Sequence, residues 1–113
     1  MKAVAGVRPM MSSRYFAGSP RTEVPVETPL RTPLTPELSD RIQSLLRRGE
    51  RRIVLDLSRV ADIDAAGAGE LVRLLNGVRA AGGSLEVEHA PRRVRQFLER
   101  AGIMPLLTAD SAA

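Results

Sequence analysis

The stretch IVLDLSRVADIDAAGAGEL, residues 53–71, decides how this chain folds. It opens with an apolar run at 53–57 that is rich in β-branched side chains. Such a run predicts an interior strand with both faces covered. After Asp64 come five residues no larger than alanine, at 65–69, and an apolar helical period then begins at Leu71. The stretch therefore predicts a strand that leads into a helix whose first turn carries very small side chains.

The helix after this strand is predicted to run from about Asp64 to Ala81. Asp64 is expected to be its N-cap, because an aspartate carboxylate accepts a hydrogen bond from a first-turn N–H and faces the positive helix end. Glu70 is expected to lie off the buried stripe of this helix. The residues expected on that stripe are Leu71, Leu74, Leu75 and Val78.

Upstream of the strand, the sequence predicts another helix. Thr35 is a suitable N-cap, Pro36 suits the first helical position, and Gly49 is a natural stop. The apolar residues that fall on one face of this helix are Leu38, Ile42, Leu45 and Leu46. A helix, a buried strand and a second helix form an α/β pattern.

Downstream, the residues from Ser84 to His89 alternate between apolar and polar, which predicts a strand with one solvated face. His89 is expected to share the buried face with Leu85 and Val87. A third helix is predicted to open at Pro91 and to end at Gly102.

Length and composition bound the possible functions. With 113 residues, the chain suits one small domain, and the absence of cysteine excludes disulfides and thiolate metal sites. The formal charge is +4, but aromatic residues make up only 3%, so platforms for base stacking are scarce and no nucleic-acid partner is expected. No apolar run of about 18 residues predicts a membrane span. The N-terminus lacks a continuous apolar signal region, and a cytoplasmic location is expected.

The chain divides into three segments. Residues 1–33 are rich in proline and are expected to be flexible or a degenerate part of the fold. One strand around Val24 to Leu30 remains an alternative for the end of this segment, since proline is tolerated at a sheet edge. Residues 34–107 are expected to form the domain, and residues 108–113 a loose tail.

The small residues at the start of the second helix are the candidate site. Ala65, Ala66 and Gly67 leave the first-turn amides with little side chain over them, which favours an anion or a closely approaching partner. Tight packing of the helix on the sheet requires the same small residues, and both interpretations remain open. Asp56, Asp62 and Asp64 are conceivable magnesium ligands, although turn and cap roles account for the last two. No cofactor, metal or catalytic set is expected.

The order and spacing of these segments resemble the STAS family, which comprises the anti-sigma factor antagonists and their relatives. The likeness is carried by residues 53–71 above, by RAAGGSLEV (79–87) and PRRVRQFLERAGI (91–103), and by TPELSDRIQSLLRRG (35–49) as the first helix. The resemblance implies an α/β fold, with a small mixed β-sheet and helices packed mainly on one side. It also implies a non-enzymatic, bacterial signalling module that binds a protein and regulates transcription.

In this family the helix start usually reads D-S-x-G or D-T-x-G, and a partner anti-sigma factor kinase phosphorylates the hydroxyl. Asp64 and Gly67 match the motif, but Ala65 stands at the phosphoacceptor position and has no hydroxyl. Asp56 matches a polar strand position that supports the acceptor. The resemblance therefore implies a docking surface at Asp64–Glu70 without the usual phosphorylation switch.

The partner that the resemblance implies is an anti-sigma factor of the histidine-kinase-like type. The residues expected to contact it are Asp62, Asp64, Ala65, Ala66, Gly67, Ala68 and Glu70. One alternative is a STAS subunit of a lipid-transport ABC complex that contacts the ATPase. A degenerate copy of the fold without a partner is another.

The front of the domain also departs from the family. The stretch VPVETPLRTPL (24–34) holds three prolines where the family has a strand pair. A sheet without its front strands exposes an edge, and a homodimer through that edge is a further expectation.

Overall fold

The structure is a computed structural model, and it describes residues 20–107. Residues 1–19 and 108–113, which hold most of the expected flexible segment and the expected loose tail, lie outside the described residues. The helices within 20–107 are all too short or too polar to cross a membrane. The elements in chain order are β1 (Arg21–Pro25), α2 (Glu37–Arg47), β2 (Arg52–Asp56), α3 (Ala65–Ala80), β3 (Ser84–Glu88), α4 (Arg92–Arg100) and the 3-10 helix η2 (Met104–Leu107).

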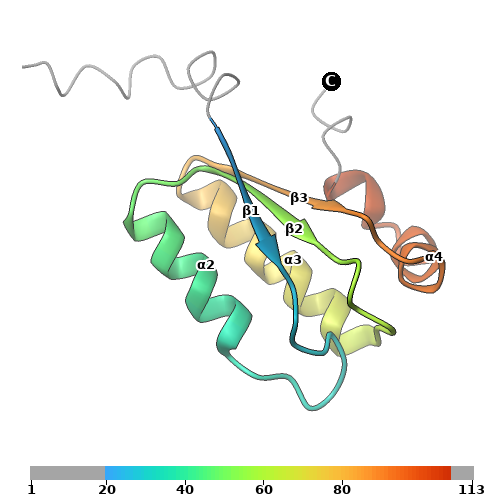
Figure 1. Ribbon diagram of the computed structural model, residues 1–113. Helices are drawn as coiled ribbons and strands as arrows, with labels where there is room; N and C mark the ends of the chain where they lie inside the picture. Colours follow the sequence, from blue (N-terminus) through green and yellow to red (C-terminus); the bar gives the residue numbers. More distant parts are fainter. Residues whose placement is uncertain (1–19, 108–113) are drawn as a thin grey trace, which may run out of the picture.

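The three strands form one sheet in the order β1-β2-β3, with β2 at its centre. Both pairings are parallel, and Ile53 of β2 lies opposite Thr22 of β1 and Leu85 of β3. The helices α2 and α3 each connect two successive strands and lie on the same side of the sheet (Figure 1). Two crossovers of one hand that proceed in the same direction place their helices on the same face. The predicted STAS-like α/β fold with helices mainly on one side is confirmed.

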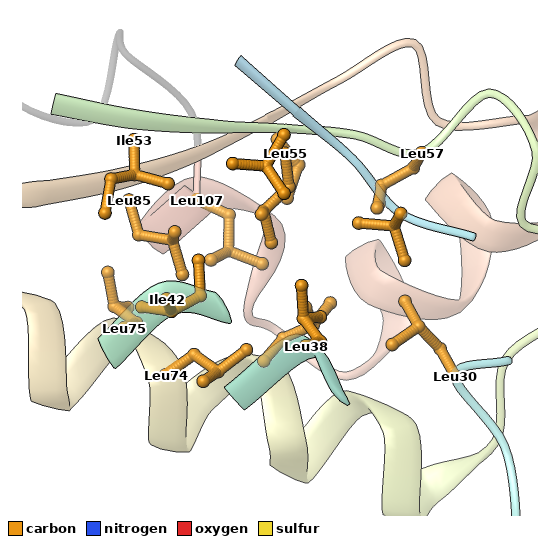
Figure 2. Close-up of a cluster of buried hydrophobic side chains, with 14 of the residues drawn as sticks. Leu30, Leu38, Ile42, Ile53, Leu55, Leu57, Leu74, Leu75, Leu85 and Leu107 are labelled. Atoms are coloured by element: carbon orange, nitrogen blue, oxygen red, sulfur yellow. The ribbon is translucent and has the colours of Figure 1, made fainter. Parts of the chain in front are cut away.

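The core lies between the sheet and these helices. Ile53 and Leu55 of β2 are fully buried, and side chains of α2, α3 and η2 surround them (Figure 2). The buried residues predicted for α3 are all confirmed, as are Leu38, Ile42 and Leu45 of α2. Leu30, from the segment after β1, completes the cluster at the end near Leu57 (Figure 2).

The opposite face of the sheet carries charged side chains. Arg21 pairs with Glu88 across the sheet, and Arg52 pairs with Glu86 at 3.7 Å. In β1 and β3 these residues alternate with the buried positions, as the period of a strand requires. In the central strand β2, Val54 is also buried, which agrees with the predicted interior strand. The alternation predicted for β3 therefore holds from Ser84 to Glu88.

The strand β1 falls within the proline-rich segment 1–33. It runs from Arg21 to Pro25 rather than from Val24 to Leu30, and it forms one edge of the described sheet. Pro25 ends the strand, and the next N–H, that of Val26, still donates to the Asp56 carbonyl at 3.0 Å. A proline is tolerated at the end of an edge strand because the pairing loses no hydrogen bond there. Pairing of a second copy along this edge stays a prediction.

Two local expectations are wrong. The N-cap of α2 is Pro36 rather than Thr35, and no side chain caps this helix. His89 does not share the buried face of β3, because the strand ends before it and its side chain is 67% exposed. The backbone of His89 has a φ of 59°, a left-handed conformation that turns the chain away from the strand direction.

Candidate functional site

Asp64 fixes the start of α3 by contacts in two directions. One carboxylate oxygen, Oδ1, accepts a hydrogen bond from the Gly67 N–H at 2.9 Å, which confirms Asp64 as the N-cap. The other, Oδ2, accepts from the Thr32 N–H at 2.8 Å. The Asp64 N–H in turn donates to the Leu30 carbonyl at 3.2 Å. We call this hydrogen-bonded set of Leu30, Thr32, Asp64 and Gly67 the clasp.

The clasp keeps Asp64 ionised. Hydrogen bonds from the backbones of Thr32 and Gly67, and a weaker one from the Thr32 side chain, lower the pKa of Asp64. Each of these donors stabilises the carboxylate over the neutral acid. The carboxylate thus accepts a hydrogen bond from a first-turn amide of α3, that of Gly67. It also binds the helix to the segment after β1 through the Thr32 N–H.

Position 67 requires a glycine because the backbone of Leu30 lies against it. A Cβ atom at position 67 would overlap the carbonyl oxygen and carbon of Leu30. A parallel β-bridge between Leu30 and Ile63, the residue before Asp64, also holds the segment after β1 against the chain that leads into α3. Gly67 and the following Ala68 are buried. For these two residues, tight packing is the interpretation that the structure supports.

The outward side of the same turn is different. Ala65, Ala66 and Gly69 are exposed, and a Cβ built on Gly69 meets nothing within 4 Å. Residues three and four apart are neighbours on a helix surface, so Gly69 lies next to both Ala66 and Ala65. We call Ala65, Ala66 and Gly69 the small-residue surface. It gives another protein access to the backbone of α3 without displacing a large side chain.

Charged side chains lie in the turn before α3 and at the ends of β1 and β2. Asp62, in the turn before α3, is 41% exposed and faces Arg93 of α4 with 4.0 Å between the charged atoms. Glu27 and Arg59 face each other at the same distance between the ends of β1 and β2. Exposed pairs of this kind add about 0–1 kcal/mol to stability. Their charges stay available to a partner.

Glu70 lies in a different place from the one expected. It is only 5% exposed, so it belongs to the buried side of α3, and it pairs with Arg73 one turn further along the helix. The sequence signal for this pair was present in the i, i+3 spacing of an acid and a base. The Glu70 carboxylate supports the helix and does not line the outer surface.

Asp56 stands at the end of β2 and stabilises the turn that follows. Its Oδ1 accepts from the Ser58 N–H at 2.9 Å. Hydrogen bonds from the backbone and then the side chain of Ser58 lower the pKa of Asp56.

A magnesium site would require the carboxylates of Asp56, Asp62 and Asp64 to lie close together. Within residues 20–107, no group of three histidine, cysteine, aspartate or glutamate side chains is arranged to hold a metal ion. The three carboxylates instead accept hydrogen bonds from separate backbone groups: Ser58 N–H for Asp56, Ile63 N–H for Asp62, and the clasp for Asp64. These local hydrogen bonds explain why an aspartate stands at each of the three positions.

The chain is similar to a known protein family. A family model described as "Mlab, STAS domain" matches residues 21–108. The matched region begins at the first residue of β1 and contains every element described above. A search of curated proteins gives no match.

Proposed function

Because the chain belongs to the STAS domain family, we propose that it is a cytoplasmic, non-enzymatic regulatory module that docks a protein partner at the start of α3. The partner is an anti-sigma factor of the histidine-kinase-like type, and docking releases the sigma factor for transcription. One observation carries this proposal: Ala65, Ala66 and Gly69 are exposed on a helix turn whose inner side is fixed by the clasp.

The clasp matters for binding because it orders the surface before the partner arrives. Binding is weakened by the entropy that is lost when loops and side chains become fixed. Alanine and glycine have little or no side-chain entropy to lose, and the backbone beneath them is held by Leu30 and Asp64. Asp62 and Arg93 supply charges beside the small-residue surface that can select the partner.

Docking at this surface does not depend on phosphorylation of residue 65. Ala65 offers no oxygen for a phosphate. The family's usual switch adds nearly two negative charges at this position, and this chain lacks that means of release. On this proposal the module stays competent to bind unless it is controlled at another residue.

A second candidate keeps the surface and changes the partner. The domain would be the STAS subunit of a lipid-transport ABC complex, with its α3 start against the ATPase. The observation that favours it is the same Ala65, since contact with an ATPase requires no phosphoacceptor. An anti-sigma kinase gene beside this one favours the first candidate, and genes for a permease and an ATPase favour the second.

The test compares two substitutions in the same helix. Ala66→Glu places a large charged side chain on the small-residue surface, where a first-turn glutamate is compatible with the helix. Ala80→Glu makes the same exchange at an exposed position in the last turn. We expect Ala66→Glu to weaken binding of the purified anti-sigma kinase from the same genome by about 30-fold or more, as loss of a central contact does, and Ala80→Glu to leave it unchanged. The ATPase from that genome is titrated in parallel.

Equal affinity of both variants for every partner that the wild type binds would contradict docking at the α3 start. Loss of binding to the ATPase alone would select the second candidate. Circular dichroism of both variants shows that the fold is retained.

A further inference from the structure

We propose that Thr32 is a phosphoacceptor that controls the small-residue surface, in place of the hydroxyl missing at residue 65. The proposal deepens the docking function above and rests on it. It assigns a modification site to the segment between β1 and α2, which approaches α3 only in the folded chain (Figure 1).

The geometry of the clasp singles out Thr32. Its backbone N–H donates to Asp64 Oδ2 at 2.8 Å, and the residue is exposed. Asp64 is the residue directly before Ala65, so Thr32 contacts the immediate neighbour of the position that carries the hydroxyl in the family. The Thr32 side chain also contributes to the lowered pKa of Asp64, in agreement with a hydroxyl that faces the carboxylate.

Two other hydroxyls near the strand ends, those of Ser58 and Thr22, are engaged elsewhere. Ser58, the nearest hydroxyl in sequence to Ala65, belongs to the turn held by Asp56. The Thr22 hydroxyl donates to Glu50 at 2.6 Å in a half-buried position. Thr32 combines exposure to solvent with direct contact to Asp64.

The chemical step is ordinary phosphoryl transfer from ATP by a serine/threonine kinase. The Thr32 hydroxyl oxygen attacks the γ-phosphorus of ATP and forms the new P–O bond. The bond between the γ-phosphorus and the bridging oxygen breaks, and ADP leaves with that electron pair. The hydroxyl proton passes to the base of the kinase.

A phosphate on Thr32 would act through charge. It adds about −1.5 to −2 at neutral pH and would stand next to the ionised Asp64. Like charges repel, so the bond from the Thr32 N–H to Asp64 Oδ2 would weaken, and the chain around Thr32 would be held less firmly to the first turn of α3. The surface would be less ordered, and the phosphate would add negative charge next to the residue that caps α3. Phosphorylation would therefore release the partner.

The modification is tested on the full chain recovered from its own host, with phosphopeptide mapping by mass spectrometry. Wild type is compared with Thr32→Val, which removes the hydroxyl but keeps the backbone N–H to Asp64, and with Thr35→Val in the same exposed segment. We expect a phosphate on Thr32 in the wild type and in Thr35→Val, and none in that peptide of Thr32→Val. A chain without phosphate at Thr32 in growing and in stressed cells would overturn the assignment.

The regulatory effect is tested separately, with phosphothreonine introduced at position 32 by semisynthesis. We expect faster amide hydrogen exchange at Thr32 and Gly67, and a loss of partner affinity of about tenfold or more. Unchanged exchange at both amides would overturn the effect on the clasp, even if no partner were known. Failure of the unmodified chain to bind either candidate partner would instead count against the proposed function.

Discussion

The carbonyl oxygen of Leu30 occupies the space that a Cβ atom on residue 67 would need, so only glycine fits there. The same oxygen accepts a hydrogen bond from the Asp64 N–H, and Asp64 accepts one from Gly67. The segment after β1 and the start of α3 are thus locked together by one short set of contacts. The inner side of the helix start is used for packing, and the outer side remains open.

This relationship predicts a large effect of one methyl group. Gly67→Ala should lower the free energy of unfolding by about 2–3 kcal/mol, because a methyl group is forced against backbone that cannot rotate away. Gly69→Ala, in the same turn, should raise it by about 0.5–1 kcal/mol, because its Cβ meets open space and alanine favours the helix. Urea denaturation followed by circular dichroism measures both. Equal stability of Gly67→Ala and wild type would mean that Leu30 does not lie where the structure places it.

The clasp also predicts a dependence of stability on pH. The pKa of Asp64 is lowered from the ordinary value of 3.8, first by the Thr32 backbone and then by that of Gly67. A group whose pKa is lower in the folded state stabilises the fold above its unfolded pKa, and this contribution is lost as the pH falls through the folded value. The difference in unfolding free energy between wild type and Asp64→Asn should therefore shrink as the pH falls below 3.8.

The comparison with Asp64→Asn is needed because Asp56 titrates in the same direction. The curve of the wild type alone combines both carboxylates, and Asp56→Asn isolates the second. A difference between wild type and Asp64→Asn that stays constant from neutral pH through this range would contradict the clasp.

The pair of Glu70 and Arg73 gives a third prediction. Glu70 is 5% exposed while Arg73 is 73% exposed, so removal of the arginine leaves a carboxylate without its partner on the buried side of the helix. Arg73→Ala should lower the free energy of unfolding by about 1–3 kcal/mol. Adding Glu70→Gln should recover part of this loss, because it removes the unpaired charge. Arg79→Ala, an exposed change in the same helix, is the control and should cost less than about 1 kcal/mol. If Arg73→Ala and Arg79→Ala lower the free energy of unfolding by the same amount, the pair of Glu70 and Arg73 has no special role.

Much of the fold could be predicted from local patterns. Leu38, Ile42 and Leu45 are spaced for one face of a helix, and Asp64 has the side chain and position of an N-cap. These features depend on neighbours within one or two turns. The strand β1 could not be placed as well, because its proline composition indicated a loop and its pairing with β2 joins distant segments.

The candidate site shows the same division. The sequence left packing and docking open for the small residues, and the structure divides them: Gly67 and Ala68 are buried, whereas Ala65 and Ala66 are exposed. The division depends on Leu30, which no pattern within residues 62–70 reveals. The contact between Thr32 and Asp64 could not be predicted for the same reason, since it exists only in the folded chain.

The central claim is that a partner protein binds the outer side of the α3 start. The most direct measurement is an NMR titration of the isotope-labelled chain with the purified partner, followed through the backbone amides. The account predicts the largest shifts and broadening at residues 62–69, with little change at Arg52 and Glu86 on the charged face of the sheet. Perturbation of the charged face while the amides of residues 62–69 stay unchanged would contradict it.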